Sequence, residues 1–414
     1  MNQTMTAPLM YAGGKTTEDY KAKSISNRNV SIGYLRAFVT LLVLAHHSVL
    51  AYHPYAPTPA QSLVVQPRLW QAFPVVDSRH WTPFSMLVGF NELFFMSLMF
   101  LLSGLFVWKS LEHKGGPTFL RDRLIRLGLP FIVAAGLVAP IAYYPAYLQT
   151  GASSGIAGFW HQWISLGNWP AGPAWFIWLL LAFDCVAVLL FALMPRWGEA
   201  VGRLSSNAAR RPFAFFGLLV ALSAAAYISM EFIFNGFSWA SFGPFTFQTS
   251  RLLHYFIYFA VGVGIGAFGI ERGLLAPDGK LARRWFAWLP ASLLVFLAAI
   301  VVIIVAMTAH SGTASWRVLS DSAFVISCAT ISFAFLALFV RFAKKRVGVW
   351  DSLSDNAYGM YLIHYPFVSW LQYALLKTQM PAIAKGSIVF LGTMLLSWGL
   401  IAGIRRIPAV ARVI

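Results

Sequence analysis

Runs of apolar residues recur along the whole chain, separated by short polar segments. About 20 apolar residues in helical conformation span the hydrocarbon core of a bilayer, so each run predicts a transmembrane helix. We expect about ten such spans. They cover residues 32–52, 84–108, 124–148, 174–194, 213–234, 252–270, 286–307, 318–340, 356–376 and 386–404. The predicted fold class is therefore all-α, a polytopic bundle in a membrane.

Composition supports this prediction. Of the 414 residues, 58% are hydrophobic and 11% are charged, against roughly 25% charged residues in soluble domains. Residues 1–30 are polar and lack the apolar core of about 7 to 15 residues that a cleavable signal needs. We therefore expect an N-terminal tail at 1–30, one transmembrane domain at 31–406 and a C-terminal tail at 407–414.

The net charge of +17 raises the question of an acidic partner. With the spans above, alternate loops and the two tails hold about 24 of the 31 Lys and Arg residues, and the opposite loops hold about six. This asymmetry predicts that both termini lie in the cytosol and that the partner of the charge is the lipid bilayer. We expect no nucleic acid partner.

The first span carries ionisable groups, which are costly inside a membrane and point to function. Arg36 and His47 are eleven residues apart, so on a helix they lie within roughly 20° of one face and about 16 Å apart along the axis. A histidine has the pKa that suits proton abstraction near neutral pH. We expect His47 to act as a base and His46, about 100° away, to pack or to support it.

A second histidine inside a span is His364, followed by Pro366, which disrupts helical hydrogen bonding. This combination is typical of a cavity lining, although a kinked helix with a hydrogen-bonded histidine remains an alternative. His364 is a candidate catalytic residue, and Tyr361 is a candidate donor contact.

The second span contains the small pair Ser103 and Gly104, which would let a backbone or a thin substrate arm approach closely. Glu92 near its outer end and Trp175 at the start of the fourth span are candidate contacts of a substrate, or else interfacial residues. Asp184 lies in the middle of the fourth span, where a carboxyl needs a partner that the sequence does not name.

Arg123 and Arg126 lead into the third span and are three residues apart. This spacing could grip the phosphates of a nucleotide donor. Anchoring to anionic lipid is the alternative.

Other kinds of site are not indicated. The two cysteines, Cys185 and Cys328, both fall in apolar runs, and the nine histidines show no metal-binding spacing, so we expect no metal or prosthetic group. The glycines Gly264, Gly266 and Gly269 match a dinucleotide fingerprint in letters only, because no strand precedes them. Close helix packing explains them better.

Taken together, these motifs resemble the membrane acyltransferase family 3 across nearly the whole chain. The resemblance is carried by Arg36 with ten residues before His47, by the segment from Phe100 to Gly104, by Arg123, Arg126 and Pro130, and by Tyr358 to His364. Within the family the chain looks like the glucan biosynthesis protein C branch. It departs from the family pattern where Met99 and Phe100 replace a Phe-Phe pair.

The resemblance implies transfer of an acyl group, acetyl or succinyl, from cytosolic acyl-CoA as co-substrate to a hydroxyl of an extracytoplasmic glycan or glycolipid. It implies that His47 is the general base and that Arg36 orients the donor or the site, in a multi-pass protein of a bacterial cytoplasmic membrane. The alternative is a transporter or flippase, for which an inverted repeat would be expected. The oligomeric state does not follow from the sequence.

Overall fold

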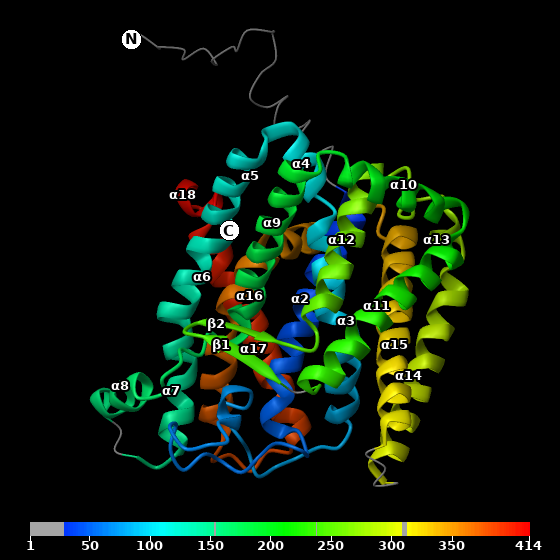
Figure 1. The fold of residues 1–414 in the computed structure, drawn as a ribbon. Coiled ribbons are helices and arrows are strands. Elements are labelled where there is room, and N and C mark those ends of the chain that lie inside the picture. The colour runs from blue at the N-terminus through cyan, green and yellow to red at the C-terminus, as the bar shows by residue number, and fades with distance from the viewer. Residues whose placement is uncertain (1–28, 153–154, 237, 309–312) are drawn as a thin grey trace, which may run out of the picture.

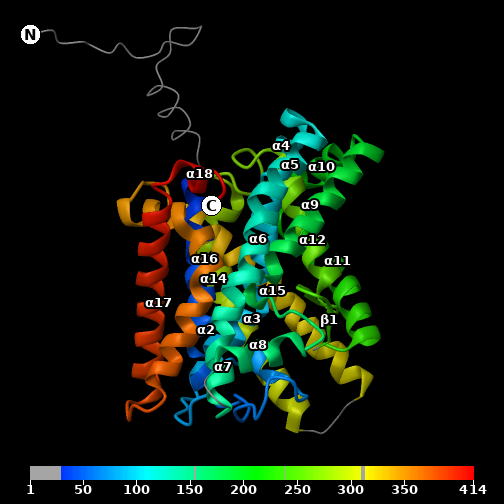
Figure 2. The same cartoon turned by 90° about the vertical axis from the view of Figure 1, so that its left-hand side faces the viewer.

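The computed structural model of the chain describes residues 29–152, 155–236, 238–308 and 313–414. Residues 1–28 of the expected N-terminal tail lie outside this part of the chain. Within it, eight helices are long and apolar enough to cross a membrane, and they run side by side between two ends (Figures 1 and 2). The prediction of an all-α, multi-pass membrane bundle is confirmed.

Over the described residues, the bundle is built from ten helical segments. They are α2 (Val30–Val49), α3 (Phe84–Gly104) continuing as α4 (Val107–Lys114), the segment of α5 (Gly116–Arg123), α6 (Leu129–Val133) and α7 (Ala139–Gln149), α9 (Trp175–Leu193), α11 (Pro212–Phe234), α12 (Leu252–Phe268), α14 (Trp285–Thr308), α15 (Ala314–Phe342), α16 (Gly348–Leu375) and α17 (Ala382–Ile404). The expected span 252–270 corresponds to α12, an apolar helix of 17 residues. The expected span 356–376 corresponds to α16, whose first half is polar.

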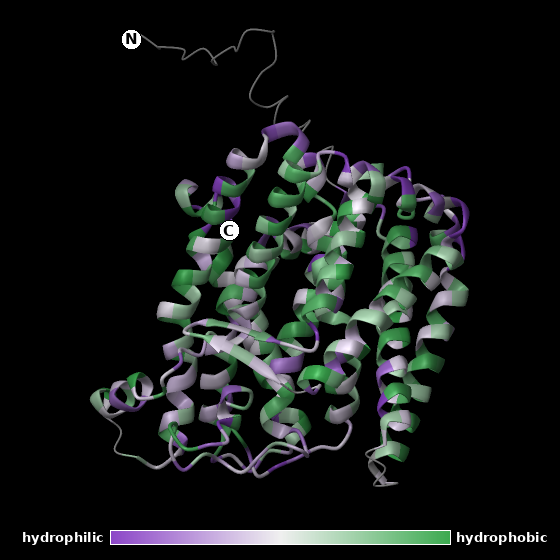
Figure 3. Cartoon of the chain, viewed as in Figure 1, coloured by the Kyte–Doolittle hydropathy of each residue, from purple (hydrophilic) through white to green (hydrophobic). Residues whose placement is uncertain are grey.

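Short helices cap one end of the bundle. Figures 1 and 2 place α4, α5, α10 (Trp197–Arg210) and α18 (Pro408–Ala411) together there, and Figure 1 adds α13 (Lys280–Arg283). Hydrophilic residues gather along this end (Figure 3). We call it the basic end because of its cations, which include Lys114, Arg121, Arg203, Arg210, Lys280, Arg283 and Arg412. The opposite end, here the far end, holds α8 (Ile156–Ile164) and the connection of residues 53–83.

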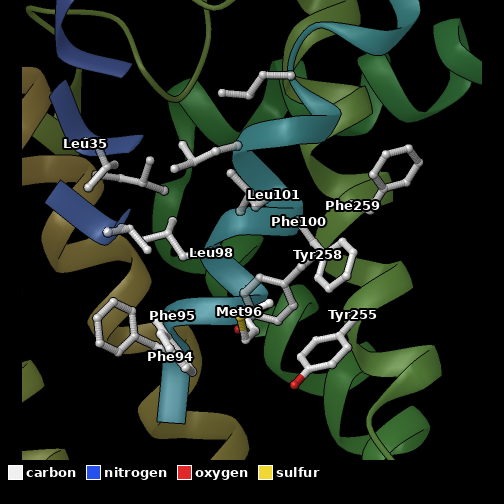
Figure 4. Close-up of a cluster of buried hydrophobic side chains, with 14 of the residues drawn as sticks. Leu35, Phe94, Phe95, Met96, Leu98, Phe100, Leu101, Tyr255, Tyr258 and Phe259 are labelled. Atoms are coloured by element: carbon white, nitrogen blue, oxygen red, sulfur yellow. The ribbon is translucent and has the colours of Figure 1, made fainter. Parts of the chain in front are cut away.

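Helices differ in how much of their surface the bundle covers. Within the most apolar stretch of each helix, 72% of the residues are buried in both α3 and α15, against 17% in α14 and 22% in α17. Helices α3 and α15 are therefore central, whereas α14 and α17 present apolar faces outward. Figure 4 shows the core around α3, where Phe100 stacks on Tyr255 of α12 with ring centroids 5.0 Å apart.

Glycines allow α3 and α12 to approach backbone to backbone. A Cβ at Gly104 would collide with the carbonyl of Phe259, and a Cβ at Gly262 or Gly266 would collide with a carbonyl of α3 or of the residue that follows it. Small residues of this kind let helices pack closely in a membrane. The prediction that the glycines of 264–269 serve helix packing is thus confirmed for Gly264 and Gly266, which face α10 and Leu105.

Prolines shape the segment from α5 to α7, which includes two π-helical stretches at Leu124–Gly128 and Ala134–Val138. Proline has no N–H, so Pro130 and Pro145 leave the carbonyls four residues earlier without their α-helical donor. Two side chains of α16 donate to these carbonyls. Tyr358 Oη reaches Arg126 O at 2.6 Å, and Trp370 Nε1 reaches Ile141 O at 3.0 Å. The bent segment is thereby fixed against α16.

The connection of residues 53–83 is fastened to the far end by a buried ion pair. Lys385 Nζ, on α17, lies 2.6 Å from Asp77 Oδ2, and the two side chains are 0% and 1% exposed. The same connection reaches the stretch around α8, where Leu63 N donates to Gln162 Oε1 at 2.9 Å. The far end is therefore covered by ordered chain.

Candidate active site

Helix α2 runs from the basic end towards the far end. It holds two of the predicted catalytic residues, Arg36 and His47. Asn29 Oδ1 caps its start by accepting a hydrogen bond from Ile32 N at 3.1 Å. Beyond its end, Asp77 N in the far-end connection donates to Ala51 O at 3.0 Å. His47 therefore lies about 16 Å beyond Arg36, towards the far end.

His47 faces His364 across the contact between α2 and α16. The atoms His47 Nδ1 and His364 Nε2 are 3.3 Å apart, and the ring centroids are 5.1 Å apart. His364 is fully buried, whereas His47 is partly exposed. The structure thus brings together two histidines that the sequence separates by 317 positions.

Backbone carbonyls fix which ring nitrogens carry hydrogen. His364 Nδ1 lies 2.7 Å from Tyr361 O, and a carbonyl can only accept, so neutral His364 keeps its hydrogen on Nδ1 and a lone pair on Nε2. His47 Nδ1 lies 2.8 Å from Val43 O and faces that lone pair, so it too must donate. Neutral His47 therefore holds its free lone pair on Nε2, where a base requires it.

Packed side chains surround this histidine pair. Tyr365 meets the His47 ring edge-on with centroids 5.3 Å apart. Gln372 Nε2 donates to the carbonyls of His47 and Ser48 at 3.0 and 3.2 Å. The His47 ring is thus held in position from α16 as well as from its own helix.

A cavity of about 530 Å³ opens at the basic end. Its wall includes the predicted residues Arg36, Ser103, Arg123, Arg126 and Tyr361. Six cations line it, namely Arg36, Lys114, Arg123, Arg126, Arg405 and Arg412, against the two carboxylates Asp122 and Asp355. This excess of positive charge suits an anionic ligand.

The cavity ends before the histidine pair. Its lining on α2 stops at Thr40 and on α16 at Tyr361, so His47 lies about two helical turns deeper and His364 about one. The Tyr361 ring borders the cavity there and packs edge-on against Phe176, with centroids 5.8 Å apart. The cavity therefore follows the face of α2 that holds Arg36 and His47 over only part of its length.

Arg123 has a partner that sequence reasoning did not identify. Its Nε lies 3.2 Å from Asp184 Oδ2, and the Asp184 side chain is fully buried. The guanidinium also lies over the Phe119 ring, 4.9 Å from its centroid. Arg123 thus neutralises the mid-span carboxylate of α9 as well as lining the cavity.

Ser103 and Gly104 turn to different neighbours. Ser103 lines the cavity and donates from Oγ to Met99 O at 2.8 Å. Gly104 is not among the lining residues and faces the α12 backbone instead. Of the two neighbours expected for this glycine, a backbone or a thin substrate arm, the structure shows the backbone of α12.

Glu92 and Trp175 lie away from the cavity, on different elements. Glu92 Oε2 is 3.0 Å from Arg251 NH1, and Glu92 Oε1 is 3.6 Å from His46 Nε2. Trp175 stacks on Tyr255 with centroids 5.9 Å apart and meets Trp239 at 5.7 Å. Trp239 belongs to a hairpin of β1 (Trp239–Phe242) and β2 (Phe245–Gln248), which the sequence did not predict.

Several polar residues of the bundle were missed as candidates. Arg251, just before the expected span 252–270, pairs with Glu92 at the start of α12. His254, fully buried, lies 3.1 Å from Ser97 Oγ and 3.5 Å from Cys328 Sγ. The signal available in the sequence was their position at or within apolar runs, which is costly without a partner.

Comparison with known proteins gives one match. A family profile described as an acyltransferase domain matches residues 29–402. No curated protein and no solved structure matches the chain. The matched segment contains the histidine pair and most of the cavity wall.

Proposed function

The chain belongs to the acyltransferase 3 family of membrane-embedded acyltransferases, and on that premise we propose that it moves an acetyl or succinyl group from cytosolic acyl-CoA to a hydroxyl of an extracytoplasmic glycan or glycolipid. The observation that carries this proposal is the histidine pair, in which His47 keeps a lone pair on Nε2. An O-acyl transfer needs one such base for the acceptor hydroxyl.

In the proposed reaction, His47 Nε2 takes the proton of the acceptor hydroxyl while the oxygen attacks the thioester carbonyl. A carbon–oxygen bond forms, the carbon–sulfur bond breaks, and the coenzyme A thiolate leaves. The proton on His47 then passes to that thiolate. His364 accepts the hydrogen bond from His47 Nδ1–H throughout and so orients the base.

The donor is proposed to bind from the basic end. Its phosphates would lie among the cations of the 530 Å³ cavity, with Arg126 and Arg123 as contacts. Arg36 would orient the donor from the cavity wall, and Ser103 and Tyr361 would flank its arm. Because the cavity stops at Tyr361, passage of the arm to His47 requires this side chain and its neighbours to move.

The acceptor is proposed to bind from the far end. Glu92 is 44% exposed there, so its carboxylate can accept hydrogen bonds from sugar hydroxyls. Trp175 offers an aromatic face beside Tyr255 and the hairpin. These features support a glycan or glycolipid acceptor.

The cellular setting completes the proposal. The basic end would lie in the cytosol of a bacterium, as the positive-inside rule requires, and both tails would lie on that side of the cytoplasmic membrane. Within the family we propose the glucan biosynthesis protein C branch, with a glucan as the acceptor.

The test measures transfer from radiolabelled acetyl-CoA and succinyl-CoA to envelope glycans, in membranes that contain the wild type, His47→Ala or His161→Ala at matched levels. His161 is an exposed histidine of α8 and serves as the control. We expect label in glycan with the wild type and His161→Ala, and none with His47→Ala. Absence of label with folded wild type and both donors would favour a transporter or flippase.

A further inference from the structure

At the start of α12, Arg251 contacts Glu92 and Phe324 as well as the side chains of Tyr227 and Tyr255. Its NH1 lies 3.0 Å from Glu92 Oε2 and 3.4 Å from the backbone carbonyl of the same residue. Its guanidinium lies over the Phe324 ring, 4.9 Å from the centroid. The side chain is only 14% exposed. Arg251 therefore holds both the carboxylate and the backbone of Glu92.

The other oxygen of the Glu92 carboxylate faces the helix of the base. Oε1 lies 3.6 Å from His46 Nε2, and the His46 side chain is 7% exposed. The His46 ring meets the His47 ring edge-on with centroids 5.2 Å apart. Glu92 is thus placed between a cation on α12 and a histidine next to the base on α2.

Exposure separates these three side chains. Arg251 and His46 are nearly buried, whereas Glu92 is 44% exposed. A ligand that arrives from outside can therefore reach Glu92 and hardly the other two. An exposed carboxylate with no fixed partner would rotate freely, but the planar guanidinium holds it in one orientation.

From this geometry we propose that Arg251 is a positioning residue of acyl transfer, which holds the Glu92 carboxylate so that it presents the acceptor hydroxyl to His47. The inference rests on the proposed function, in which Glu92 contacts the acceptor. Arg251 acts through Glu92 and touches no reacting atom.

A purely structural clip between α3 and α12 is the competing explanation. These helices already meet through Gly104 and Gly262, so their association does not depend on one ion pair. A second ion pair of arginine and glutamate in the chain can serve as a control for Arg251 and Glu92. Arg317 NH2 lies 2.8 Å from Glu231 Oε2, and its guanidinium lies over the Phe232 ring. Within the part of the chain that the structure describes, no histidine forms an ion pair with Glu231.

The experiment is a double-mutant cycle with Arg251→Gln, Glu92→Gln and both together, with Arg317→Gln as control. Steady-state transfer is measured with acetyl-CoA as donor and linear β-glucan oligosaccharides as acceptor probe. We expect Arg251→Gln to lower kcat/KM for the acceptor about ten-fold while KM for the donor stays within about two-fold. The double variant should equal Glu92→Gln alone, because Arg251 acts through that carboxylate.

Losses that multiply in the double variant would overturn the inference, as would an Arg251→Gln protein no more impaired than Arg317→Gln. If Arg251→Gln does not accumulate, Arg251→Lys replaces it. Lysine keeps the charge but not the planar grip, so we expect about a three-fold loss with Glu92 present and none in Glu92→Gln. Equal losses in both backgrounds would overturn the inference. A Glu92→Gln protein with normal transfer would instead remove Glu92 from the proposed function and leave His47 to its own test.

Discussion

At its Arg36 end, the polar face of α2 borders a cavity of about 530 Å³ whose wall carries six cations. At its His47 end, the same face meets Tyr365 and His364, which hold the imidazole by packing and a hydrogen bond, and Gln372, which donates to the His47 backbone carbonyl. Helix α2 therefore borders an open, charged cavity at Arg36 and a closely packed, enclosed site at His47.

The difference between the two ends of α2 indicates which end binds the donor and which end holds the base. A cluster of cations around open space can attract and hold an anion, but it fixes no reacting group. A base, in contrast, must be held in one tautomer and one orientation before its substrate arrives. We infer that donor affinity resides at the basic end and chemistry at the histidine pair.

Replacement of Lys385 should have the largest effect, a loss of stability at the far end of the bundle. Lys385→Met leaves the buried carboxylate of Asp77 without its cation, and breaking such a pair costs about 3 to 5 kcal/mol. We expect a clear drop in thermal stability in detergent. The control is Lys280→Met, which removes an exposed lysine at the basic end. Equal unfolding temperatures for the two variants would show that the far-end ion pair is not needed.

Removal of His364 should have the next largest effect. In His364→Ala the Nδ1–H of His47 loses its side-chain acceptor, so the base is less well oriented. Loss of a group that orients a metal-binding histidine typically costs about 10- to 100-fold in activity, and we take the same range for a group that orients a base. We expect kcat to fall by that range while KM for the donor is unchanged. An increase in donor KM with normal kcat would instead assign His364 to donor binding.

Arg126→Gln should have the smallest effect and should act on the open end. The cavity keeps five other cations, so we expect KM for acetyl-CoA to rise about three- to ten-fold with little change in kcat. The difference from the wild type should shrink at high salt, because exposed charges are screened. A matched control is Arg203→Gln, on the exposed face of α10. A fall in kcat at saturating donor would contradict the division between the two ends.

The sequence was informative where the signal is local. Apolar length predicted the spans, and the spacing of Arg36 and His47 placed both on one face of α2. Partners in distant segments could not be predicted, because nothing local specifies them. Asp77 and Lys385 are 308 positions apart, and His47 and His364 are 317 apart. The partner of Asp184 proved to be Arg123, on another helix.

Three further features depended on local packing and backbone geometry that periodicity does not describe. Gly104 reads equally well as a cavity residue or a helix contact, and only the approach of α12 decides between them. The end of the cavity at Tyr361 depends on Phe176, a residue of another helix. The π-helical stretch Leu124–Gly128 also changes the register of Arg126 relative to an ideal helix.

Donor binding and acyl transfer, measured separately in purified His47→Ala and Arg126→Gln, test the division along α2 most directly. We predict that His47→Ala binds acetyl-CoA within about two-fold of the wild-type affinity yet transfers at least about 100-fold more slowly. Arg126→Gln should bind the donor more weakly and reach nearly normal turnover at saturation. Wild-type transfer by His47→Ala would contradict the assignment of the base, and with it the division between the two ends.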